Sequence, residues 1–106
     1  MNYETKILPS GIIVENRPSI NCKYLWYIKD TYVFHNEGEP ALEYKDGNKC
    51  WYQHDKYHRT DGPAIEYANG DKNYYIDDVF YKEEEYWNHV LVLKYLQEHP
   101  ELKAFT

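Results

Sequence analysis

The feature that most restricts the fold of this chain is a stretch of 13 residues that is present twice. Residues 40–52 (PALEYKDGNKCWY) recur without a gap as residues 63–75 (PAIEYANGDKNYY), 23 positions later. A unit that recurs at a fixed period is typical of proteins that stack one small supersecondary element. The middle of each copy holds Asp46-Gly47 or Asn69-Gly70, and these dipeptides favour the two-residue turns of β-hairpins. The sequence therefore predicts consecutive β-hairpins.

A third, weaker copy precedes the two clear ones. Residues 34–41 (FHNEGEPA) are similar to residues 57–64 (YHRTDGPA). In this first unit Trp26 is 14 residues before Pro40, whereas in the second unit Trp51 is 12 residues before Pro63. The first unit therefore carries two extra residues near 31–33, which we expect to form a bulge or a longer turn. The dipeptides His54-Asp55 and Asp77-Asp78 stand at equivalent positions of the other units and predict a tight turn in both.

The predicted turns also determine which strand residues face each other. Two-residue turns at the Gly dipeptides place Leu42 opposite Trp51 and Glu43 opposite Cys50. Successive strand residues point to opposite sides. The side expected to form the core then holds Leu42, Tyr44, Trp51, Ile65, Tyr67 and Tyr74.

The other strand residues follow from the same pairing. Lys49 and Lys72 are expected to cover the tyrosines of the core side with their methylene stems. Tyr52 and Tyr75 are expected to form a second aromatic row on the opposite, wetter side. The hairpins would then have one buried face and one wet face.

The segments around the repeats complete the expected domain organisation, a single domain of residues 1–106. Residues 1–22 are an N-terminal segment with an edge strand at 12–14, and residues 23–82 hold the hairpin repeats. Residues 83–99 are expected to form a helix that caps the last hairpin, as repeat arrays need a lid on their last unit. The fold class is therefore mainly β, an antiparallel meander of consecutive repeated β-hairpins with one C-terminal capping α-helix.

The bounds of the helix follow from charge and from proline. The three glutamates at 83–85 favour a helix start, because the helix dipole stabilises negative charge in the first turn. Pro100 forces an end near Glu98. Between them lies a broad apolar face made of Tyr86, Trp87, Val90, Leu91, Val92, Leu93, Tyr95 and Leu96.

Three short motifs carry a family resemblance. HRTDGPA at 58–64, Asn69-Gly70 and Trp51-Tyr52 resemble the H-R-x-D-G-P-A and N-G-x-x-x-W-Y signatures of a MORN-like β-hairpin repeat family of phages, large DNA viruses and bacteria. The resemblance covers about residues 24–90. This chain departs from it at His54-Asp55, where the family has Asn-Gly. The resemblance implies a MORN-like sheet used for binding, with no catalytic residues to transfer.

Composition limits the classes of partner. The chain has 18 acidic and 12 basic residues and a formal net charge of -6. Affinity for nucleic acid comes from Lys and Arg at the phosphates, so direct nucleic-acid binding is disfavoured. A net negative field can instead attract a basic protein surface. Thirteen tyrosines supply rings that pack while their hydroxyls stay wet.

No segment predicts a membrane or a secretory location. The first residues do not form a signal peptide, and the longest apolar run, 90–93, is too short to span a bilayer. We therefore expect a cytoplasmic protein that does not contact a membrane, in the host cytoplasm if a phage encodes it. Cys22 and Cys50 stand at unrelated positions of the repeat and are expected to be reduced packing residues.

Two pairs of histidines are candidates for metal binding or acid–base chemistry. His54 and His58 are four residues apart with Asp55 between them, but they fall on a turn and a strand and are expected to be solvated, so no metal site is predicted. His35 and His58 occupy the same repeat position, where a nearby carboxylate could make a general base, yet no nucleophile accompanies them. We expect them to hold the turns. The chain is thus predicted to be no enzyme and to need no cofactor.

The function expected from these features is protein binding. Partner contacts are assigned to Tyr27, Tyr52, Tyr75, Asp55, Asp77 and Asp78. The hypothesis is a non-enzymatic, phage-encoded inhibitor of a bacterial defence protein, similar to an anti-CRISPR, that occupies a basic nucleic-acid-binding surface of the host protein.

One alternative is a sponge for a nucleotide or other small aromatic ligand, with bases on the tyrosines and phosphates on Lys49, Arg59 and Lys72. Another is an antitoxin-like partner of a toxin, and a homodimer stays open.

Overall fold

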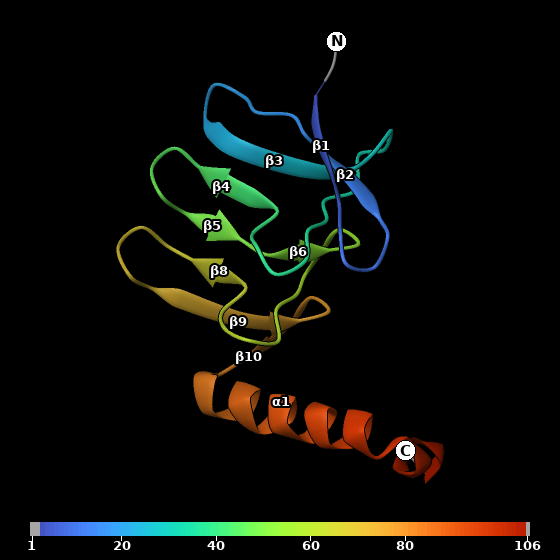
Figure 1. Cartoon of the computed structure of the whole chain (residues 1–106). Coiled ribbons are helices and arrows are strands. Elements are labelled where there is room, and N and C mark those ends of the chain that lie inside the picture. Colours follow the sequence, from blue (N-terminus) through green and yellow to red (C-terminus); the bar gives the residue numbers. More distant parts are fainter. Residues whose placement is uncertain (1–2, 106) are drawn as a thin grey trace.

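The computed structural model describes residues 3–105, which form ten short strands, one α-helix and one 3-10 helix (Figure 1). The strands are β1 (Glu4–Ile7), β2 (Ile13–Asn16), β3 (Cys22–Ile28), β4 (Leu42–Tyr44), β5 (Lys49–Cys50), β6 (Tyr52–Gln53), β7 (Lys56–Tyr57), β8 (Ile65–Glu66), β9 (Lys72–Ile76) and β10 (Val79–Tyr81). The helices are α1 (Glu83–Glu98) and η1 (Pro100–Phe105).

The predicted antiparallel meander is confirmed. Eight strands form one sheet in the order β1-β2-β3-β4-β5-β8-β9-β10, and β6 pairs with β7 in a separate ribbon. Every pairing is antiparallel. The molecule is thin, 49 × 33 × 16 Å, because one layer of sheet carries most of it. On each face of the sheet, the side chains of that face must therefore shield one another from water.

The turns at the Gly dipeptides differ from the prediction by one residue. Gly47 has φ 103° and its N–H donates to the carbonyl of Tyr44 (3.0 Å), while Asp46 is not in the positive-φ region. The loop is therefore a three-residue one, a type I turn closed by a left-handed glycine. Glu43 faces Lys49 and Leu42 faces Cys50. The second hairpin repeats this geometry, with Gly70 at φ 96° and Glu66 opposite Lys72.

This shift makes the predicted assignment of faces wrong for half of the residues. A slip of one residue moves every side chain of a strand to the other face. Leu42 and Tyr44 share a face with Ile65 and Tyr67, as expected, but the aromatic residues of the returning strands exchange sides. We call the face with Leu42, Cys50, Tyr52, Ile65 and Tyr75 the tyrosine face, and the face with Glu43, Lys49, Trp51, Glu66, Lys72 and Tyr74 the ladder face.

Two consequences correct the sequence analysis. Lys49 and Lys72 do not cover the tyrosines of the core side, because they lie on the ladder face opposite Glu43 and Glu66. The row that holds Tyr52 and Tyr75 does not lie on a wet side opposite the core either. Both rings pack against the buried cluster of Cys22, Leu42, Cys50 and Ile65.

The tight turns at the other end of the hairpins are confirmed. His54 and Asp55 have φ 49° and 68°, and Asp77 and Asp78 have φ 48° and 67°. Positive φ at both central residues defines the type I′ turn. The first unit is longer, as predicted: Tyr27 bridges to Phe34, seven residues on, whereas the equivalent pairs are five apart.

The N-terminal segment contains more regular structure than expected. β2 does not form the sheet edge, since it lies between β1 and β3. The edge is β1, whose sequence ETKI lacks a clear apolar period, and its exposed charged side chains suit an unpaired edge. Val14 of β2 is fully buried with Leu8, Trp26 and Ala41.

The helix has the predicted bounds and lies beyond β9 and β10, at the end of the sheet opposite β1 (Figure 1). Its anchor is Tyr86, which is fully buried with Tyr74 and Ile76. Its hydroxyl donates to the carbonyl of Arg59 (2.6 Å) and accepts from the N–H of Gly62 (3.1 Å). The predicted broad apolar face is not buried: Tyr86 is the one buried residue of α1. Within residues 3–105 no helix is long and apolar enough to cross a membrane.

Candidate docking surface

The tyrosine face carries a continuous row of rings, which we call the aromatic strip. Neighbouring ring centroids are 6.3, 4.6, 5.0, 4.6, 5.0 and 5.6 Å apart. Aromatic pairs at these distances attract each other beyond the area that they bury. In order across the molecule, the strip consists of Tyr32, Tyr27, Phe34, Tyr52, Tyr57, Tyr75 and Phe80.

Each repeat contributes two rings to the strip, one before and one after its tight turn. The three pairs face each other across the turn: Tyr27 and Phe34, Tyr52 and Tyr57, Tyr75 and Phe80. The first member of each pair is a predicted contact residue, and the second is not. The signal was present, since residues 34, 57 and 80 are spaced by 23 and are all aromatic.

The interior of the strip is half-buried and its ends are exposed. Tyr32 is 87% exposed and Phe80 is 56% exposed, while the rings between them are of intermediate burial. Burial raises the pKa of Tyr52, and the hydrogen bond with Tyr57 and the nearby ionisable side chains raise it further. The Tyr52 hydroxyl therefore stays neutral near pH 7. The inner rings stack face to face, so the strip presents ring edges and neutral hydroxyls to an approaching molecule, and free ring faces only at its exposed ends.

Acidic residues lie at the tight turns along one side of the strip, and two of them have structural duties. The carboxylate of Asp55 accepts the N–H of Phe34 (3.2 Å), and that of Asp78 accepts the N–H of Tyr57 (2.7 Å). The side chains of Asp30 and Asp77 are 81% and 68% exposed. All three predicted contact acids are exposed, and the Asp77 carboxylate lies 3.1 Å from His58 Nδ1.

One end of the strip already holds a guanidinium group of the chain itself. Arg17 lies with its guanidinium carbon 4.5 Å from the ring centroid of Tyr27 and 5.4 Å from that of Tyr32. Glu15 pairs with this guanidinium at 2.6 Å, and both side chains are largely buried. Arg17 thus shows a complete arrangement for a guanidinium on this surface, with ring faces beneath it and a carboxylate beside it.

The ladder face has different chemistry. Glu43, Lys49, Glu66 and Lys72 alternate in sign across four neighbouring strands, each opposite the next. Such cross-strand pairs stabilise a sheet. A groove of about 560 Å³ on this face is lined by Trp26, Trp51, Lys49, Glu43 and Glu66 among others. The two glutamates also pair with cations outside this row, Glu43 with Lys23 (3.9 Å) and Glu66 with Arg59 (3.5 Å).

Arg59 is fixed on the ladder face. Its guanidinium carbon lies 3.9 Å from the ring centroid of Trp51, and its nitrogens donate to Asp61 (2.8 Å) and the carbonyl of Pro63 (3.0 Å). The three cations assigned to a nucleotide, Lys49, Arg59 and Lys72, are thus on the opposite face from Tyr52 and Tyr75. One small ligand cannot contact both sets.

The repeat histidines hold turns, with the same contact in successive units. His35 Nδ1 accepts the N–H of His54 (3.0 Å), and His58 Nδ1 accepts the N–H of Asp77 (3.2 Å). His35 is almost fully buried, and its Nε2 contacts the carboxylate of Glu37 at 2.9 Å, so both of its ring nitrogens are engaged. Over residues 3–105 no group of three or more His, Cys, Asp or Glu side chains is placed to hold a metal ion.

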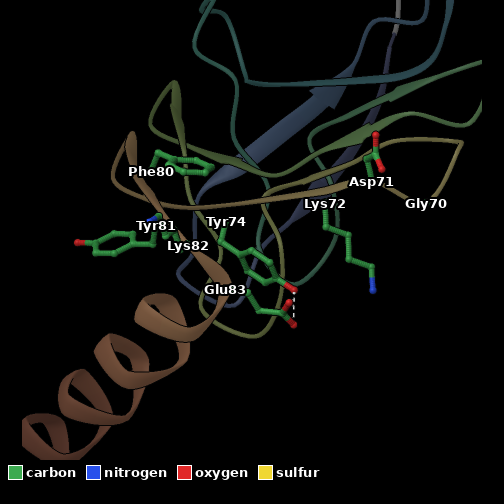
Figure 2. Close-up of a pocket in the computed structure, with 8 residues that line it drawn as sticks. All are labelled: Gly70, Asp71, Lys72, Tyr74, Phe80, Tyr81, Lys82 and Glu83. Atoms are coloured by element: carbon green, nitrogen blue, oxygen red, sulfur yellow. Dashed lines mark hydrogen bonds between the residues drawn. The ribbon is translucent and has the colours of Figure 1, made fainter.

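A second hollow lies where β9, β10 and the start of α1 meet (Figure 2). Its volume is about 380 Å³, and Tyr74 donates to the carboxylate of Glu83 (3.2 Å) in its wall. Lys72 lines the same hollow (Figure 2). The hollow joins the helix to the sheet and gathers no nucleophile beside a base.

The comparisons with known proteins add no relative. No family model, no curated protein and no solved structure matches the chain.

Proposed function

We propose that the chain is a non-enzymatic protein-binding module, and that its aromatic strip binds an arginine-bearing basic surface of a partner protein. The observation that carries this proposal is Arg17, whose guanidinium lies over Tyr27 beside Glu15. The strip continues past Arg17 with five more rings of the same kind, and exposed acids lie at its side. Arginines of a partner would stack on the rings at the exposed ends of the strip, Tyr32 and Phe80, and would contact the ring edges between them.

Charge and shape favour a protein as the occupant. The net charge of -6 attracts a basic surface over distance and repels phosphates. The strip is an extended row on a thin sheet, whereas small ligands are taken up in concave sites. Tyr is among the residues that dominate the energy of protein interfaces.

The direct test compares two peptides of equal charge, one alternating Gly and Arg and one alternating Gly and Lys. Arg stacks on ring faces with its planar guanidinium, whereas Lys offers a point charge. Isothermal titration is expected to show tighter binding of the Arg peptide. Phe80→Ala and Tyr32→Ala, at the exposed ends of the strip, are each expected to weaken it about threefold to tenfold.

The matched control is Tyr95→Ala. Tyr95 is 54% exposed, close to the 56% of Phe80, but it lies on α1 outside the strip. It is expected to leave the affinity unchanged. Equal binding of both peptides, or an equal loss with Tyr95→Ala, would overturn the proposal.

The finer part of the proposal concerns the partner. A phage-encoded inhibitor that covers the nucleic-acid-binding face of a bacterial defence protein would need an acidic, aromatic surface of this kind. The test is cleavage of DNA by a purified CRISPR effector nuclease, with wild-type protein and with Phe80→Ala. Inhibition by the first and its loss in the second would support this partner class, and cleavage unaffected by a molar excess of wild type would refute it for that nuclease.

The antitoxin alternative uses the same surface and differs only in the partner. The sponge alternative has less support, since the cations that it requires lie on the ladder face with their own acidic neighbours. The family resemblance of the repeats also stays a proposal.

A further inference from the structure

Among the described residues, most of the second half of α1 is exposed. Five consecutive residues, 91–95, are all exposed, and they include Leu91 (64%), Val92 and Tyr95. An isolated helix of this length is marginal in water, and most helical stability in proteins comes from packing. Contiguous exposed apolar surface of this kind marks an interaction site.

The outer side of α1 has the spacing of a coiled-coil seam. Glu84, Trp87, Leu91, Lys94 and Glu98 follow each other at intervals of 3, 4, 3 and 4 residues. Residues spaced in this way form one stripe along a helix. The stripe does not include Tyr86 or Val90, which pack toward the sheet, and Trp87 lies at its border, edge-on to Tyr74 and Tyr86. Its two apolar members, Trp87 and Leu91, are 40% and 64% exposed.

We propose that this stripe pairs with the same stripe of a second copy of the chain, with the two helices antiparallel. In the register that places Trp87 opposite Leu91 of the second copy, Glu84 lies opposite Lys94 of the second copy. A two-fold axis repeats both contacts, so the interface has two apolar pairs and two ion pairs. A parallel pair would place Glu84 against Glu84 and Lys94 against Lys94. Charge complementarity therefore selects both the occupant and its direction.

This inference does not depend on the aromatic strip, which lies on another surface. Sedimentation velocity of the full chain over a range of concentrations is expected to show a monomer–dimer equilibrium. Leu91→Glu is expected to weaken the dimer more than about 100-fold, because it places a charge in the apolar centre. The matched control is Val92→Glu, an exposed apolar residue outside the stripe, which is expected to leave the dimer intact.

Charge reversal tests the direction of pairing. Glu84→Lys and Lys94→Glu are each expected to weaken the dimer about tenfold, and the double variant is expected to restore it. Circular dichroism checks that each variant keeps its helix. The proposal is overturned by a wild-type protein that stays monomeric at its highest soluble concentration, by equal effects of Leu91→Glu and Val92→Glu, or by a double variant that is weaker than both single ones.

Discussion

The guanidinium of Arg59 lies over the indole of Trp51, 3.9 Å from its ring centroid, and joins one hairpin to the connector of the next. The side chain also binds Asp61 and the carbonyl of Pro63. A Cβ atom on Gly62 would come within 2.8 Å of the Arg59 Cζ. A side chain at position 62 would therefore displace the Arg59 guanidinium from its place over Trp51.

The first prediction concerns this pair. Gly62→Ala and Arg59→Ala are each expected to lower the free energy of unfolding by about 1–2 kcal/mol, through loss of the stacked, hydrogen-bonded guanidinium. Because Gly62→Ala acts by displacing Arg59, the double variant should be less destabilised than the sum of the two. Urea unfolding measures all three, with Lys56→Ala as an exposed control. Additive effects would show that the two residues are not coupled.

The second prediction concerns the anchor of α1. Tyr86→Phe removes a buried hydroxyl that donates to the Arg59 carbonyl and accepts from the Gly62 N–H. It leaves both backbone groups without their partner, so a loss of about 1–3 kcal/mol is expected. Faster hydrogen exchange at the Gly62 amide should accompany it. Tyr95→Phe, at an exposed position on the same helix, should change neither quantity.

The third prediction concerns the structural role of Asp55 in its tight turn. Its carboxylate accepts the N–H of Phe34, and its φ of 68° is left-handed. Asp55→Asn keeps an acceptor and tolerates this φ, so it is expected to be nearly neutral. Asp55→Ala loses both and should cost about 1–2 kcal/mol. Thermal unfolding compares them, and equal stability of the two variants would contradict the assigned duty.

The fourth prediction concerns alkaline pH. Burial, with Cys22 as a neighbour, raises the pKa of Cys50 from 9.0 to about 11. The unfolded chain therefore releases this proton first as pH rises, so stability is full below pH 9 and falls between about pH 9 and 11. Burial raises the pKa of Tyr44, Tyr74 and Tyr86 as well, which extends the loss above pH 10.

Urea midpoints measured from pH 7 to 11 test this sign. Cys50→Ala is expected to be less stable at pH 7, since it leaves a cavity, but to lose less stability between pH 9 and 10. A midpoint that rises with pH over this range would contradict the prediction.

The repeat predicts the meander and both tight turns. Which side chains share a face of the sheet depends also on whether the turn at each Gly has two or three residues. A Gly after Asp or Asn suits a two-residue turn and also the last position of a three-residue one. The charged residues distinguish the two turn lengths, because only the three-residue turn places Glu43 opposite Lys49 and Glu66 opposite Lys72. The prediction that Trp51 is buried is correct. Trp51 lies on the ladder face, however, and the guanidinium of Arg59 covers its indole there. Strand alternation alone does not reveal this contact.

The sequence predicts three rings of the aromatic strip and leaves out the rings that pair with them. Tyr27, Tyr52 and Tyr75 were found because they follow Trp or Tyr in each unit. Of their partners, Phe34 forms only an isolated bridge, Tyr57 lies on a strand too short to show alternation, and Phe80 lies on the last hairpin. Arg17 joins the strip from a connector, so only the tertiary structure places it there.

The most direct test of the central claim is an NMR titration of the protein with the Gly–Arg peptide, observing aromatic side-chain resonances. We predict that the ring signals of Tyr52, Tyr57 and Tyr75 shift together with those of Phe80, while the indole signals of Trp51 on the ladder face do not. Shifts confined to Trp51, or spread equally over both faces, would contradict the assignment of the aromatic strip as the docking surface.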